Sequence, residues 1–164
     1  MNEPLEEIAK EPSFAKNAAV DTGANITFFL AVGSVLDYCA GLNFSGIVAS
    51  RAYATIVNTV TGTPYGMWRD FVYRVTRTTE KSGKARKYFA DLFSLNTFAT
   101  PMYVSSLAFG SFLSEGHVNW EKVKHGAEYG ILISPFVGPA FGHYMDFARK
   151  MFGIKSAPEK AGEK

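Results

Sequence analysis

Residues 92–114 read LFSLNTFATPMYVSSLAFGSFLS, a run of 23 residues without one charged side chain. A helix that spans the hydrocarbon core of a membrane needs about 20 mostly apolar residues. A helix of a soluble bundle instead carries polar residues along its solvent face, and this stretch has no charge on any face. We therefore expect it to cross a membrane.

Three further segments of low charge accompany this one. Charge-free runs of 15, 17 and 16 residues cover 22–36, 52–68 and 129–144. They reach spanning length if Asp37, Arg69, Glu128 and Asp146 lie at helix ends or inside a bundle. The sequence thus predicts an all-α membrane protein with four transmembrane helices, over residues 21–42, 51–73, 88–113 and 123–152. A soluble four-helix bundle is the alternative.

The composition agrees with one folded unit. Of the 164 residues, 47% are hydrophobic and 20% are charged, which excludes a disordered chain. The single cysteine, Cys39, excludes an internal disulfide and a cysteine-rich zinc site. No phosphate loop or hydrolase motif is present, so we expect no enzyme activity, cofactor or metal. We divide the chain into a polar acidic segment 1–17, a transmembrane domain 18–154 and a polar tail 155–164.

Lysine and arginine set the orientation. Seven of them lie between the last residues of the second predicted span and the start of the third: Arg69, Arg74, Arg77, Lys81, Lys84, Arg86 and Lys87. The positive-inside rule places this loop and both termini on the cytoplasmic or matrix side of an inner membrane, of a cell or an organelle. We expect five of these side chains to bind anionic lipid head groups, namely Arg74, Arg77, Lys84, Arg86 and Lys87. The net charge of +2 gives no reason to expect a nucleic-acid partner.

Small residues recur every four positions in the second and fourth spans. The fourth span carries Gly126, Gly130, Ser134, Gly138 and Gly142, and the second carries Ser50, Ala54, Asn58, Gly62 and Gly66. Residues four apart share a helix face, and small faces let helix backbones approach closely. We expect these stripes to pack within the bundle or in a homo-oligomer, and some of their members could line a path for a small solute.

The two stripes also suggest an internal repeat. Gly66 and Asp70 match Gly142 and Asp146 at an offset of 76, while Asp21 matches Asp91 at an offset of 70. A duplicated two-helix hairpin, repeated in parallel orientation, accounts for both offsets. With the orientation given above, all four aspartates lie near the inner surface of the membrane. Two roles remain open for them, structural ion pairing and the handling of protons or substrate.

One motif has a specific counterpart. Residues 64–70, PYGMWRD, with Ser50, Arg51 and Asn58 upstream, resemble the core motif of the L-alanine exporter family. Supporting similarities lie at 19–22, 90–91, 101–103 and 142–152, so that the resemblance covers about 17–154. It implies a four-span inner-membrane exporter of L-alanine and related small amino acids, driven by the proton gradient.

Two functions follow from these observations. For an exporter, Arg51 or Arg69 would bind the carboxylate of the amino acid and an aspartate its ammonium group. The pathway residues expected are Asp21, Arg51, Asn58, Tyr65, Gly66, Arg69, Asp70, Asp91 and Asp146. Four spans are few for a transport path, so a homo-oligomer is expected. The alternative is a scaffold or accessory subunit that transports nothing, within a larger inner-membrane complex.

Overall fold

The computed structural model describes residues 14–163, and within them all regular structure is helical. Four long helices, α2 (Phe14–Cys39), α3 (Phe44–Val75), α4 (Lys84–Glu115) and α5 (Trp120–Met151), form a bundle, and a short α6 (Ala157–Ala161) follows. The all-α, four-helix architecture predicted from the sequence is confirmed. Most of the predicted acidic segment, residues 1–13, lies outside the described residues.

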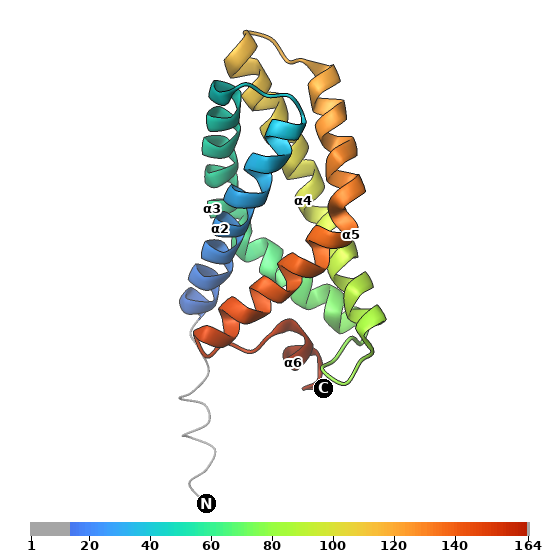
Figure 1. The fold of residues 1–164 in the computed structure, drawn as a ribbon. Coiled ribbons are helices and arrows are strands. Elements are labelled where there is room, and N and C mark those ends of the chain that lie inside the picture. Colours follow the sequence, from blue (N-terminus) through green and yellow to red (C-terminus); the bar gives the residue numbers. More distant parts are fainter. Residues whose placement is uncertain (1–13, 164) are drawn as a thin grey trace, which may run out of the picture.

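The connections divide the bundle into two ends (Figure 1). The α2–α3 and α4–α5 turns lie at one end, and the start of α2, the α3–α4 loop and α6 lie at the other. We call the second the inner end, after the predicted orientation. Two turns are fixed by side-chain caps, because Asn43 accepts a hydrogen bond from Gly46 N at 2.8 Å and Asn119 accepts one from Lys122 N at 3.2 Å.

Helices α3 and α5 change direction along their length, and their inner halves run obliquely across the bundle (Figure 1). Pro64 lies inside α3, and Pro135 and Pro139 lie inside α5. A proline removes one backbone hydrogen bond and bends its helix. As a result the end of α5 packs against α2, and the end of α3 packs against α4.

The distribution of polarity is the reverse of that in a soluble bundle. Large apolar side chains point outward on every long helix, for example Tyr38, Val60, Phe112 and Phe136, which are 74%, 71%, 50% and 79% exposed. Serines, aspartates and arginines are buried instead. By length and composition alone, α2 is the one described helix apolar enough to cross a membrane. Helices α3, α4 and α5 carry buried polar residues such as Arg69, Asp91 and Arg149, which lower their mean hydropathy.

The polar tail predicted from residue 155 is not freely solvated. Ser156 and Ala157 are buried, and Ala157 packs with Val72, Tyr73 and Ala90 at the inner end of the bundle. Helix α6 thus covers the ends of α3 and α4.

Candidate substrate pathway

Two buried arginines lie at the inner end of the bundle. Arg69, on α3, has no exposed surface. Its Nε donates to Asp91 Oδ1 on α4 at 2.9 Å, and its Nη1 donates to Asp146 Oδ1 on α5 at 2.7 Å. One guanidinium therefore joins three helices.

Arg149, on α5, is equally buried and binds the other two aspartates. Its Nε donates to Asp21 Oδ1 on α2 at 2.8 Å, and its Nη1 donates to Asp70 Oδ1 on α3 at 2.6 Å. Lys160 of α6 also donates to Asp70, at 2.8 Å. We call these six residues the inner charge layer: Asp21, Arg69, Asp70, Asp91, Asp146 and Arg149.

The pairing crosses the bundle. The sequence suggests ion pairs between neighbours, Arg69 with Asp70 and Asp146 with Arg149. Ion pairs do form, but each arginine binds the aspartate on the other bent helix. Arg69 and Asp70 are adjacent and point to different sides of α3, and the bends of α3 and α5 bring Arg69 to Asp146 and Arg149 to Asp70. Arg149 was missed as a pathway residue, since the sequence places it in a basic cluster with Lys150 that resembles an interfacial anchor.

The inner charge layer is not electrically balanced. Four aspartates face two arginines, and Lys160 adds one further positive charge, so one negative charge remains in excess. Removing one partner of a buried ion pair leaves an uncompensated charge and costs about 3–5 kcal/mol. The layer thus holds four helices together and resists partial opening.

Glycines make room for this layer at equivalent places. A Cβ added at Gly66 would collide with the carboxylate of Asp21, and one added at Gly142 would collide with that of Asp91. One turn away, a Cβ at Gly62 would lie 2.6 Å from Thr22 Cα, and one at Gly138 would lie 3.1 Å from Leu92 Cα. The offsets of 70 and 76 relate these contacts. The duplicated hairpin remains a prediction, with which they agree.

Aromatic side chains cover the charge layer on its outer side. Tyr65 is 2% exposed, and its ring centroid lies 5.1 Å from that of Phe141 and 5.6 Å from that of Phe98. Ala24, Leu95 and Met145 pack into the same cluster. Charge layer and aromatic cluster together close the bundle at the inner end.

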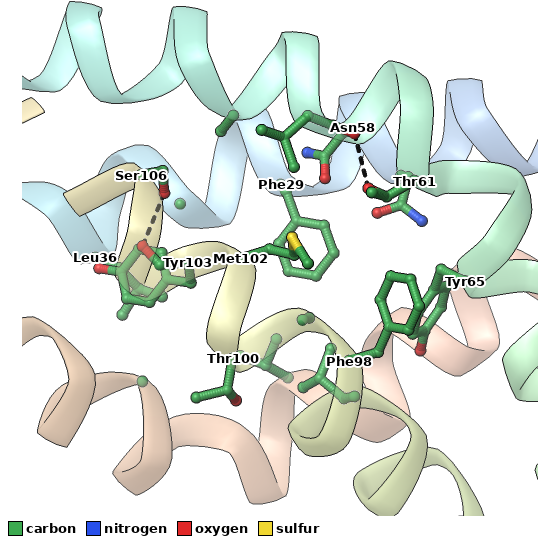
Figure 2. Close-up of a pocket in the computed structure, with 18 of the residues that line it drawn as sticks. Phe29, Leu36, Asn58, Thr61, Tyr65, Phe98, Thr100, Met102, Tyr103 and Ser106 are labelled. Carbon is green, nitrogen blue, oxygen red and sulfur yellow. Dashed lines mark hydrogen bonds between the residues drawn. The ribbon is translucent and has the colours of Figure 1, made fainter. Parts of the chain in front are cut away.

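A cavity of about 70 Å³ lies beyond the aromatic cluster, and all four long helices line it. Figure 2 shows Phe29 and Met102 near its middle, with Thr61, Tyr65 and Phe98 toward one end and Leu36, Tyr103 and Ser106 toward the other. Asn25, Asn58 and Thr100 add further polar groups. Three predicted pathway residues, Arg51, Asn58 and Tyr65, thus line the cavity. Gly66, Arg69 and the four aspartates lie at the charge layer.

Arg51 marks the outer end of the cavity. Its Nε donates to Asp37 Oδ2 at 2.8 Å, its Nη2 donates to Asp37 Oδ1 at 3.0 Å, and its Nη1 donates to the carbonyl oxygen of Phe29 at 3.0 Å. Asp37 has no exposed surface. Of the two places that the sequence allows for Asp37, a helix end or the inside of the bundle, the structure has Asp37 near the end of α2 and inside the bundle, where Arg51 binds it.

The small-residue stripes are occupied within the chain. Gly126 faces Leu107 and Ala40, Gly130 faces the ring of Tyr103, and Ser134 accepts a hydrogen bond from Asn96 at 3.2 Å. These positions are therefore covered by helices of the same chain and are not available to a second copy of the protein. Of the two packings expected for the stripes, within the bundle or in a homo-oligomer, these contacts support the first.

The predicted lipid-binding side chains lie at the inner end. Arg74, Arg77, Lys84 and Arg86 are exposed, while Lys87 is half-buried and donates to the carbonyl oxygen of Glu80 at 2.8 Å. Within residues 14–163, no three side chains of the metal-binding types gather in one place.

Comparison with known proteins agrees with the motif. The sequence profile of a family described as L-alanine exporter matches residues 10–155. The L-alanine exporter AlaE of Citrobacter koseri is 30% identical over 142 residues, which are 86% of this chain and 91% of that protein. The exporter of the same name from Escherichia coli K12 is 29% identical over 140 residues, 85% of this chain and 89% of that protein. No solved structure matches.

Proposed function

This chain belongs to the L-alanine exporter family, and from that premise we propose that it carries L-alanine or a related small amino acid out across an inner membrane. One structural observation supports the proposal most. A cavity lined by all four long helices lies directly beyond a buried layer of charges that joins the same helices. A scaffold could use the charge layer to hold its helices together, but it has no need of the cavity.

We propose that all four long helices span the membrane. Helix α2 has 26 residues and the others have 32 each. At 1.5 Å per residue each exceeds the hydrocarbon thickness of about 30 Å. Their outward apolar side chains suit lipid, and the buried ion pairs explain why composition alone does not identify three of them.

The basic α3–α4 loop supports an orientation with both termini on the cytoplasmic side. Its exposed arginines and lysines would contact anionic lipid head groups there. A homo-oligomer, if formed, would use the apolar outer surfaces of the helices, since the small-residue stripes are covered.

The closed inner end suggests how export is gated. A cytoplasmic amino acid reaches the cavity only when the inner charge layer and the Tyr65 cluster part. Opening separates Arg69 and Arg149 from their aspartates, and the freed groups can then bind the carboxylate and ammonium groups of the substrate. Arg51 would meet the substrate carboxylate at the outer end of the cavity.

The excess negative charge supports proton coupling. A proton on one aspartate of the layer neutralises that excess and weakens the hold of the carboxylate on its arginine. Proton uptake from outside would then favour opening of the layer, so that inward proton flow drives outward flow of the amino acid.

A matched pair of variants tests this proposal. Arg149→Gln removes a buried arginine of the charge layer, and Arg74→Gln makes the same change at an exposed position. We expect cells loaded with alanine to export it with wild-type protein and with Arg74→Gln, and to lose most of that export with Arg149→Gln. Protein abundance in the membrane is measured alongside. If a correctly inserted Arg149→Gln protein exports alanine normally, the charge layer is not part of the export pathway.

A further inference from the structure

Two side chains that line the cavity have a buried hydrogen-bonding group without a partner among residues 14–163, Asn25 on α2 and Tyr103 on α4, and Asn25 is the more deeply buried. Asn25 is 4% exposed and lines the cavity from α2, and its Nδ2 has no hydrogen-bond partner in the described part of the chain. Buried polar groups in native proteins are nearly always paired, and an unpaired one calls for an explanation. A bound ligand that accepts a hydrogen bond supplies the missing partner.

The volume of the cavity limits the size of that ligand. A water molecule needs about 10–15 Å³ by the same measure, so about 70 Å³ holds roughly five to seven non-hydrogen atoms. Glycine, alanine and serine fall in this range. Leucine and phenylalanine exceed it.

The cavity is longer than such a ligand. Asn25 and Gly33 both line it from α2, and eight residues of helix extend about 12 Å. Phe29 lies midway between them, and Met102 approaches it from α4 in the centre of the cavity (Figure 2). These two side chains mark the middle of the cavity, between an inner half, next to Tyr65, and an outer half, next to Tyr103 (Figure 2).

Resting on the proposed export function, we propose that the cavity binds one small amino acid as a zwitterion, with its charged groups in the inner half. Asn25 donates a hydrogen bond to its carboxylate. Thr61 Oγ1, which donates to the carbonyl oxygen of Val57 at 2.8 Å, keeps lone pairs for the ammonium group. Met102, in the middle of the cavity (Figure 2), lies beside the side chain of the bound amino acid and sets the upper limit on its size.

Two variants with controls test this site in liposomes that contain the purified protein. Asn25→Leu keeps the size of the side chain and removes its donor. We expect the alanine concentration at half-maximal transport to rise about tenfold or more, because hydrogen bonds to a charged group are the stronger ones. Thermal unfolding in detergent checks that this variant folds.

The second variant is Met102→Ala, which removes three non-hydrogen atoms from the boundary of the inner half. We expect the ratio of leucine transport to alanine transport to rise about tenfold or more, since each methylene in a pocket is worth roughly that factor. Met67→Ala is the matched control, because Met67 is 60% exposed on α3 and does not line the cavity. We expect it to leave the ratio unchanged.

The outcomes separate the two proposals. If the wild type transports alanine while Asn25→Leu and Met102→Ala match it in half-saturation and in selectivity, the binding site is wrong and the export function stands. If Asn25→Leu does not fold, the selectivity of Met102→Ala decides. If the wild type transports no amino acid at all, both proposals are overturned.

Discussion

Gly62→Ala should force α2 and α3 apart. The added Cβ would lie 2.6 Å from Thr22 Cα and 2.9 Å from Thr22 Oγ1, whereas ordinary van der Waals contact begins at 3.4 Å. The Cα atom belongs to the backbone and cannot rotate away, so the two helices must separate by about 1 Å. Overpacking of this kind costs about 1–3 kcal/mol. The better helix propensity of alanine returns at most about 1 kcal/mol.

Two other glycines provide graded controls. A Cβ at Gly138 would lie 3.1 Å from Leu92 Cα, a milder conflict, and one at Gly23 would meet nothing within 4 Å. Unfolding of the purified variants in detergent, followed by circular dichroism, should therefore rank Gly23→Ala as the most stable, Gly138→Ala next and Gly62→Ala last. Equal stability of Gly62→Ala and Gly23→Ala would refute the close packing of α2 against α3.

Three further predictions concern charge, topology and pH. Asp70→Asn keeps the size of the side chain but removes the negative charge that Arg149 and Lys160 bind. Alanine export should therefore collapse while the protein still inserts into the membrane. Unaltered export would show that Asp70 has a structural role only. Ser82 lies in the α3–α4 loop, which we place on the cytoplasmic side. In a variant without Cys39, the thiol introduced by Ser82→Cys should react with a membrane-impermeant reagent only after the membrane is permeabilised. Labelling in intact cells would contradict this orientation. The Ser156 side chain and backbone N donate hydrogen bonds to the Glu159 carboxylate, which caps the start of α6, and these bonds lower the pKa of Glu159. The cap therefore stabilises α6 at a pH above the ordinary pKa of glutamate, and this stabilisation is lost as the pH falls below the lowered pKa. Amide exchange in α6 should accordingly accelerate in acid, and a rate that does not change with pH would exclude the cap as its cause.

The sequence predicts the four-helix architecture and the aspartates of the inner end correctly, for physical reasons. Long runs without charge have few stable alternatives to a helix in lipid. Charges at the ends of those runs must be paired if they are buried, so Asp21, Asp70, Asp91 and Asp146 stand out from the pattern of charge alone.

The partners of these charges could not be predicted, because they depend on the bends at Pro64, Pro135 and Pro139. Each bend carries the end of a helix across the bundle, and a sequence pattern gives no direction for it. Arg149 illustrates the consequence, since nothing local distinguishes it from the exposed Lys150 beside it. The sequence likewise leaves open whether Asp37 is exposed or buried, because its partner Arg51 lies on the next helix.

The cavity likewise arises only from the packing of all four helices. Its polar lining includes Asn25, which no motif indicated, and Asn58 and Tyr65, which the resemblance to the exporter family did indicate. Small-residue stripes were visible as such, but whether they face a helix of the same chain or of another copy is decided by tertiary structure.

The most direct test of the account is alanine counterflow by the purified protein alone in liposomes. Liposomes loaded with unlabelled L-alanine should take up labelled L-alanine from outside above the external concentration, and an inward proton gradient should accelerate the release of alanine. Uptake no greater than that of liposomes without protein would contradict the central claim that this four-helix chain is itself the transporter.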